Sequence, residues 1–134
     1  MLNKIISKFI LLQFIICCLI SCSNGDTTFS KPDNDIIILY DNDVHCAVNG
    51  YPKFAALRNE MLTTTPFVTT VSCGDFLQGE SIGAYTQGKA IANIMNSVGY
   101  DLVTLGNHEF DYGVEQLFSI TNMLNATTLN CNFR

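Results

Sequence analysis

Residues 36–45 read Ile-Ile-Ile-Leu-Tyr-Asp-Asn-Asp-Val-His, so a continuous apolar run leads directly into a group of polar side chains. An apolar run without polar alternation is typical of a strand that is buried on both faces, as in a parallel sheet. Similar runs, rich in β-branched residues, follow at 67–72, 102–105 and 127–131. The sequence therefore predicts four short strands, the first of them at 36–40.

Three helical patterns separate these runs. Pro52 can open the first helix, and Gly99 can cap the end of the second. The expected apolar stripe of the first helix is Phe54, Leu57 and Met61, and that of the second is Ala90, Ile91, Ile94, Met95 and Val98. The third helix is expected at 111–122, with Asp111 near its start. The order βαβαβαβ predicts an α/β fold whose largely parallel sheet is connected by right-handed crossovers.

The composition limits the class of protein. The chain has 134 residues, which is one domain at most, and 7 Lys+Arg against 12 Asp+Glu give a net charge of −5. An acidic balance of this kind excludes a broad basic surface for nucleic acid. Hydrophobic residues make up 48% of the chain, which excludes a disordered protein.

Residues 1–21 resemble a secretion signal. Lys4 and Lys8 supply a positively charged start, and 9–20 is an apolar run in which only Gln13 is polar. A run of this length is too short for a comfortable membrane span. We therefore expect 1–21 to direct export.

The end of this apolar run resembles the lipobox of bacterial lipoproteins. It reads Leu19-Ile20-Ser21-Cys22, and in a lipobox the chain is cleaved before the cysteine, whose thiol is then acylated. We expect Cys22 to anchor the protein to the cell membrane or cell surface through lipid, with 22–35 as a polar tether. The alternatives are an ordinary signal peptide and an uncleaved anchor. Three cysteines then remain, an odd number that does not fit a disulfide framework: Cys46, Cys73 and Cys131.

Polar side chains follow the first three predicted strands. Asp43 and His45 follow the first strand, Asp75 follows the second, and Asn107 and His108 follow the third. The spacing is 32 residues in both steps (43 to 75 and 75 to 107), about one βαβ unit each. Because ligands bind at the carboxyl edge of open α/β sheets, these residues are expected to meet in one site.

The residue types suit a metal centre. Asp43 and His45 are two apart in a segment expected to be extended, so both side chains would face one cation. A carboxylate and an imidazole suit zinc, manganese or iron better than calcium. A calcium loop starting at Asp41 is excluded because Cys46 and Pro52 stand at its glycine and glutamate positions. Asp75 can offer one oxygen to each of two ions.

A second group points to proton transfer. His108 and Asp111 lie three apart at the expected start of a helix, so the carboxylate can accept the imidazole N–H and keep the ring protonated. An imidazolium near a phosphate would protonate the leaving oxygen. Taken singly, Asp75 could be a helix cap, Asn107 a turn residue in the left-handed region and Asp111 an N-cap.

The combined pattern resembles the calcineurin-like metallophosphoesterases, and within them the 5′-nucleotidase branch. The matching motifs are Asp43-Val44-His45, Gly74-Asp75 and Gly106-Asn107-His108-Glu109, followed by Phe110-Asp111-Tyr112-Gly113. The resemblance covers about 36–133 and implies the layered α/β sandwich of that family and hydrolysis of a phosphoester such as a 5′-nucleotide.

The resemblance also implies roles for individual residues. Two divalent metal ions, zinc, manganese or similar, would be bound. Asp43 and His45 would bind one ion, Asp75 would bridge both, and Asn107 would bind the second. His108 with Asp111 would form the catalytic dyad.

The chain departs from this family in two ways. Cys46 and Cys73 stand where a glycine and a small residue are common; both are expected to be small buried residues, and a thiolate ligand at Cys73 is the alternative. The family also uses later histidines, including a Gly-His-x-His motif, whereas this sequence has none after His108. We therefore expect 36–134 to be the amino-terminal part of a catalytic domain, inactive in this form. The alternative is a catalytically silent surface lipoprotein or binding module derived from a broken gene.

The lipobox leads to a direct test. Cells fed a fatty-acid analogue should label the protein, and Cys22→Ala should abolish the label because it removes the acylated thiol. Cys18→Ala, the same substitution within the apolar run, should leave the label in place. Unchanged labelling of the Cys22 variant would contradict the lipid anchor.

Overall fold

Four strands form one parallel sheet in the computed structural model, which describes residues 35–131. The strands lie in sequence order and are β1 (Ile37–Asp41), β2 (Val68–Ser72), β3 (Leu102–Thr104) and β4 (Thr127–Leu129). The predicted strands and the parallel α/β sheet are confirmed, although β1 is shifted by one residue from its predicted range and the other three strands are shorter than their apolar runs. The predicted signal peptide, Cys22 and the tether up to residue 34 lie outside the described residues.

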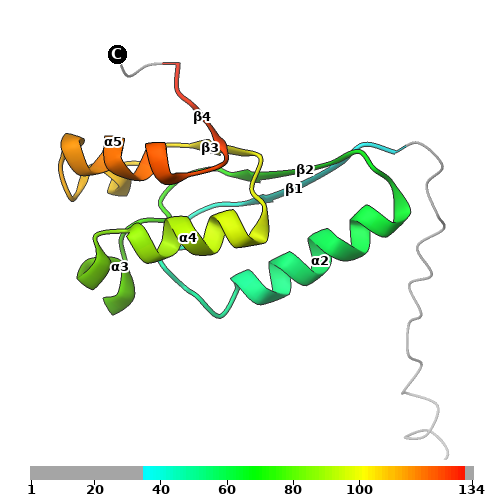
Figure 1. Cartoon of the computed structure of the whole chain (residues 1–134), viewed down its shortest axis with the longest axis horizontal. Helices are drawn as coiled ribbons and strands as arrows, with labels where there is room; N and C mark the ends of the chain where they lie inside the picture. The colour runs from blue at the N-terminus through cyan, green and yellow to red at the C-terminus, as the bar shows by residue number, and fades with distance from the viewer. Residues whose placement is uncertain (1–34, 132–134) are drawn as a thin grey trace, which may run out of the picture. The chain divides into compact units, whose positions relative to one another are not determined.

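Helices connect every pair of neighbouring strands. Those helices are α2 (Tyr51–Thr64), α3 (Ser81–Thr86), α4 (Lys89–Val98) and α5 (Val114–Met123), with the short 3-10 helix η1 (His108–Phe110) before α5. Contacts run from α2 to α4 and from α4 to α5, so these three helices form one layer along the sheet (Figure 1). Right-handed crossovers that always step in the same direction place successive helices on the same face, which explains this single layer.

The hydrophobic core lies between the helix layer and the sheet. On α4, Ile91, Met95 and Val98 are buried as the sequence predicts, and Gly99 ends the helix with a positive φ of 88°. Val103 of β3 is buried on the same side of the sheet. Among the described residues no helix is both long and apolar enough to cross a bilayer.

The expectation that the first strand is buried on both faces is wrong for the described chain. In and beside β1, Ile36, Ile38 and Tyr40 are 75%, 62% and 71% exposed, whereas Ile37 and Leu39 are partly buried. The reason is the single helix layer, which covers one face of the sheet and leaves the other face without cover among the described residues.

Two helix predictions also need correction. In α2 the buried side includes Tyr51 and Arg58, whose Nε donates to Thr70 Oγ1 at 3.1 Å, while Leu57 is 41% exposed. The helix predicted at 111–122 begins only at Val114, because Gly113 has a φ of 86° that interrupts the chain before it. The short helix α3 has no counterpart in the sequence prediction.

Candidate metal centre

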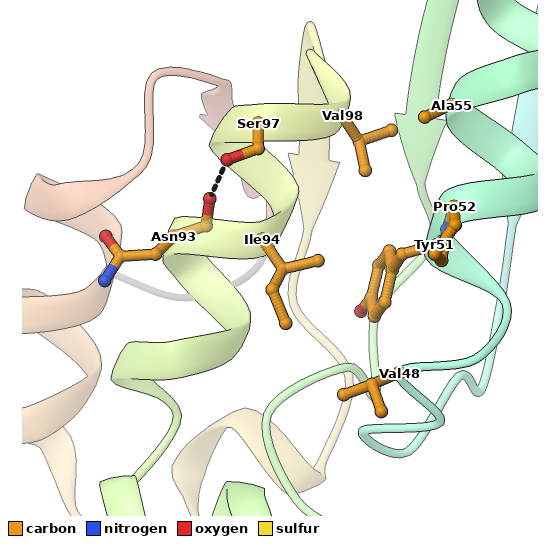
Figure 2. A pocket seen from close by; sticks show the side chains of 8 residues that line it. All are labelled: Val48, Tyr51, Pro52, Ala55, Asn93, Ile94, Ser97 and Val98. Carbon is orange, nitrogen blue, oxygen red and sulfur yellow. Dashed lines mark hydrogen bonds between the residues drawn. The ribbon is translucent and has the colours of Figure 1, made fainter.

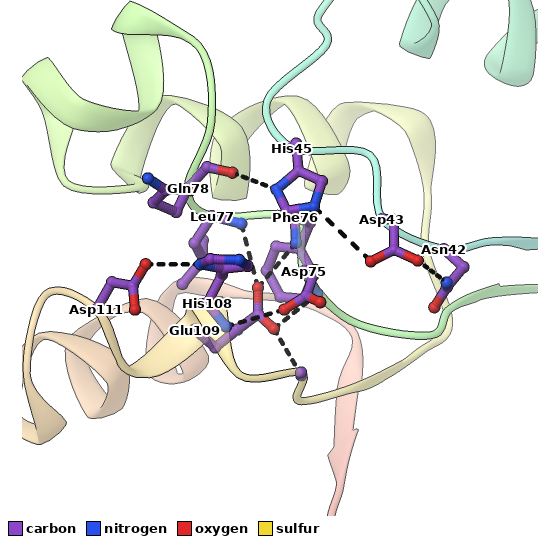
Figure 3. A network of polar contacts seen from close by, with 11 residues as sticks. Asn42, Asp43, His45, Asp75, Phe76, Leu77, Gln78, His108, Glu109 and Asp111 are labelled. Carbon is purple, nitrogen blue, oxygen red and sulfur yellow. Dashed lines mark hydrogen bonds and ion pairs between the residues drawn. The ribbon is translucent and has the colours of Figure 1, made fainter.

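The predicted site residues lie on loops at the carboxyl ends of the first three strands. The loop after β1 carries Asp43 and His45, the loop after β2 carries Asp75, and the loop after β3 carries His108 (Figure 3). The parallel sheet places these three loops at one edge, since every strand runs in the same direction. The sequence prediction of a shared edge is confirmed by this arrangement.

Asp43, His45 and Asp75 form a group that could hold a metal ion. Each of them offers one ligand atom, and these atoms all lie within 4.8 Å of one another. His45 Nε2 is 3.7 Å from Asp43 Oδ1. Two carboxylates and one imidazole are donors suited to zinc or manganese, so the residues fit a divalent cation.

The backbone of this group differs from the prediction. Asp43 and His45 are not extended, because their φ angles are 55° and 47°, both in the left-handed region. The conformation is held by the neighbouring loop: the N–H of Asp43 donates to Gly74 O at 3.2 Å, and that of His45 donates to Asp75 O at 2.9 Å. Backbone hydrogen bonds therefore join the two loops at the residues that carry the candidate ligand atoms.

The ring of His45 is oriented by the loop after β2. Its Nδ1 lies 3.0 Å from Gln78 O, and because a carbonyl only accepts, Nδ1 carries the proton and Nε2 is left for a metal. Gly79 permits this approach: a Cβ there would lie 2.1 Å from His45 O, closer than any real contact. The tight packing of this loop on His45 thus selects the ring nitrogen that faces Asp43.

Asp75 occupies a strained position between the loops. Its φ is 57°, and Gly74 before it has a φ of 103° and lies so close to Gly106 that a Cβ would come within 2.5 Å of Gly106 N. Asp75 Oδ1 accepts the N–H of His108 at 2.9 Å. Asp75 is not a helix cap, since the cap residue of α3 is Glu80.

His108 and Asp111 form the predicted pair. His108 Nδ1 is 2.7 Å from Asp111 Oδ2, and this hydrogen bond raises the pKa of His108 above its ordinary value. His108 begins η1 and Asp111 follows its end, so the pair does not lie at the start of α5. A 3-10 turn therefore brings the two side chains together. The His108 ring is 5.1 Å from that of His45, which places the pair beside the metal group.

Asn107 lies at the N-terminus of η1 and is exposed. Its φ of −75° is right-handed, so the alternative of a left-handed turn residue is wrong, and its side chain makes no capping hydrogen bond. Its assignment to a second metal ion stays a prediction.

The two cysteines behave differently. Cys46 is fully buried as expected, its Sγ donates to Phe76 O at 3.4 Å, and burial raises the pKa of its thiol. Cys73 is exposed, which corrects the expectation that it is buried, because it follows buried Ser72 and alternation along the chain places it on the other side from Ser72. It does not belong to the group of candidate ligands found among the described residues, and Cys46, Cys73 and Cys131 are all free.

Glu109 is a residue of the site for which no role was predicted from the sequence. It is completely buried, and its carboxylate accepts the N–H groups of Asp75 at 2.8 Å and Gly106 at 2.6 Å. The sequence signal that could have identified Glu109 is an acidic residue directly between His108 and the aromatic Phe110. A carboxylate at that position needs hydrogen-bond donors, and the site supplies them.

A separate cavity of about 380 Å³ lies between α2 and α4 (Figure 2). Its walls are mostly apolar, and they contain none of the predicted site residues. The lining residues are Val48, Tyr51, Pro52, Ala55, Asn93, Ile94, Ser97 and Val98. The groups able to bind metal and transfer protons therefore lie at the sheet edge and not in this cavity.

The contact between His108 and Asp111 predicts a measurable pKa difference. Asp111→Asn should lower the pKa of His108 toward its ordinary value, because the amide does not stabilise the imidazolium as a carboxylate does. NMR titration with chelator present would show this, and the chain's only other histidine, His45, serves as the internal control. An unchanged His108 titration in the variant would refute the pairing.

Comparison with known proteins agrees with this geometry. The sequence profile of the calcineurin-like phosphoesterase family matches residues 36–133. The 5′-nucleotidase of Bos taurus is 30% identical over 118 residues, which cover 75% of this chain and 21% of that protein. A probable 5′-nucleotidase of Treponema pallidum is 33% identical over 89 residues, covering 66% of this chain and 15% of that protein. The chain thus spans about a fifth or less of the length of these relatives.

Solved structures show the same fold. The calcineurin-like phosphoesterase YfkN from Bacillus subtilis has a TM-score of 0.63 and 26% identity, covering 74% of this chain and 37% of that one. The NAD nucleotidase of Haemophilus influenzae has a TM-score of 0.66 and 27% identity, covering 72% of this chain and 23% of that one. The fold, the convergence of the loops and the match to the family profile all agree. The chain belongs to the calcineurin-like phosphoesterase family.

Proposed function

We propose that this chain contributes part of the active site of a metal-dependent phosphoester hydrolase that acts on 5′-nucleotides. The observation that carries the proposal is the convergence of Asp43, His45 and Asp75 within 4.8 Å, with His108 beside them. Relatives named 5′-nucleotidase support the substrate class. Because the chain spans only part of these relatives, the activity is proposed for a protein in which further residues complete the site.

We propose two divalent ions for this site, zinc, manganese or similar. Asp43 and His45 would hold one ion, Asp75 would lie between the two, and Asn107 would bind the second. The fit rests on the donor set, which combines carboxylate and amide oxygens with one imidazole nitrogen. When bound, such ions would polarise the phosphoryl oxygens and neutralise the charge that develops on them.

His108 has the geometry of a general acid. Asp111 occupies its Nδ1, so Nε2 is the nitrogen that can donate a proton to the leaving oxygen of the phosphoester. The raised pKa keeps a larger fraction of the ring protonated near neutral pH. The protonated ring would also attract a phosphate oxygen, and Asp111 would hold the ring in place during transfer.

The chain alone is proposed to be a weak catalyst. Both of its histidines already belong to this site, so no further imidazole is available to complete the coordination of two ions. This ligand shortage also supports the second candidate, a catalytically silent lipoprotein or binding module. For either candidate we propose export and a lipid anchor at Cys22, which rest on 1–21 and the Leu19-Ile20-Ser21-Cys22 sequence.

Metal binding should separate the roles of Asp75 and His108. Asp75→Ala should weaken binding of Mn²⁺ or Zn²⁺ by about tenfold or more, because a ligand is lost, whereas His108→Ala should change it by less than about twofold. Isothermal titration calorimetry of the purified chain would measure both, with the exposed Glu115→Gln as a control for lost negative charge. Equal losses in the two variants would make His108 a ligand and the proposed dyad wrong.

Catalysis can be tested with nucleoside 5′-monophosphates and added Mn²⁺ or Zn²⁺. The chain should release phosphate slowly, orders of magnitude below a complete two-metal site, because loosely held ions position the reacting groups poorly. His108→Ala should remove what activity there is. Robust turnover by this chain would refute the shortage of ligands, and complete absence of metal binding would favour the silent module.

A further inference from the structure

The buried carboxylate of Glu109 connects the two loops that carry Asp75 and His108 (Figure 3). Glu109 Oε2 accepts the N–H of Asp75 at 2.8 Å and that of Gly106 at 2.6 Å. Oε1 accepts the N–H of Phe76 at 2.8 Å and that of Leu77 at 3.1 Å. One side chain therefore receives four backbone donors, three of them from a loop 32–34 residues away in sequence.

These donors would otherwise be difficult to satisfy. Glu109 is 0% exposed, and Phe76 and Leu77 are each 1% exposed, so water does not reach this part of the loop freely. In the described part of the chain Glu109 forms no salt bridge with a lysine or arginine. Hydrogen bonds from backbone N–H groups to an ionised carboxylate are strong and directional, so they hold the loop in a defined shape.

The shape that they hold is the strained one. Asp75 has a φ of 57°, in the left-handed region, which is less favourable than the right-handed region for a residue with a Cβ. Its own N–H is bonded to Glu109, and the next two N–H groups are bonded to the same carboxylate. Glu109 thus acts on the backbone of Asp75 at the point where the strain is located.

The contact is reciprocal. Asp75 Oδ1 accepts the N–H of His108, the residue immediately before Glu109. The carboxylate of each loop therefore binds the backbone of the other, and this sets the separation of Asp75 from His108. Glu109 reaches the reacting groups only through these neighbours.

We propose that Glu109 is a positioning residue that imposes the left-handed conformation of Asp75 and fixes Asp75 relative to His108. The role in metal affinity rests on the proposed function of Asp75 as a ligand. Glu109→Gln keeps the size of the side chain but replaces one acceptor oxygen with an amide donor, which opposes the N–H groups. Glu109→Asp keeps the charge but is too short to reach both loops.

The affinity for Mn²⁺ tests this role in the purified chain. Both Glu109 variants should bind Mn²⁺ about tenfold or more weakly, the range typical for loss of a group that orients a metal ligand. Glu115→Gln, which removes an exposed charge, should stay within about twofold. Val98→Ala, a buried change at the end of α4 before β3, should lower the melting temperature yet also stay within about twofold. Wild-type affinity in the Glu109 variants, or an equal loss in Val98→Ala, would overturn the proposal.

A second measurement needs neither metal nor a folded variant. In the wild-type chain with chelator, NMR should detect couplings across the hydrogen bonds from the amide nitrogens of Asp75, Phe76, Leu77 and Gly106 to the carboxyl carbon of Glu109. The backbone carbon shifts of Asp75 should report a positive φ. Absence of the couplings, or an extended Asp75, would overturn the proposal. If the wild-type chain binds no Mn²⁺ while the couplings are present, the proposed function fails and the positioning role stands.

Discussion

The buried carboxylate of Glu109 is the constraint on which the geometry of the site depends. Three successive residues after β2, Asp75, Phe76 and Leu77, direct their N–H groups inward, and a buried donor without a partner is strongly unfavourable. Glu109 satisfies these donors from the loop after β3, together with one donor of its own loop. The two loops are thereby held together in the conformation that brings Asp75 next to His108. A single buried side chain thus holds the loops that carry Asp75 and His108.

Unfavourable backbone conformations are concentrated in the loops after β1 and β2. Among the described residues five non-glycine residues have a positive φ, and four of them are in the two loops after β1 and β2: Asp43, His45, Cys46 and Asp75. Such conformations persist where surrounding contacts impose them, and they are frequent at functional sites. Here the contacts are backbone hydrogen bonds from Asp43 to Gly74 and from His45 to Asp75. Strain in the loops is the physical consequence of directing several polar side chains toward one point.

The arrangement of the helix layer and the sheet leaves the candidate site at an edge of the sheet. All crossovers cover the same face, so α2, α4 and α5 pack into one layer and the core forms beneath them. The opposite face of β1 presents Ile38 and Tyr40 to solvent. The loops at the carboxyl edge belong to neither face, which leaves their polar side chains free to converge. A parallel sheet with four strands in sequence order produces this edge without further elements.

The sequence by itself determined the strands, the parallel order and the identity of the converging side chains. Apolar runs and 32-residue spacing are local or periodic signals, and together they place Asp43, Asp75 and Asn107 after successive strands. Only the tertiary structure decided the backbone of those loops, the exposure of Ile38 and Cys73, the interruption before α5 and the role of Glu109. Each of these depends on contacts between segments far apart in sequence. A buried carboxylate that binds N–H groups more than 30 residues away leaves no periodic signal, because its partners are backbone atoms that every residue possesses.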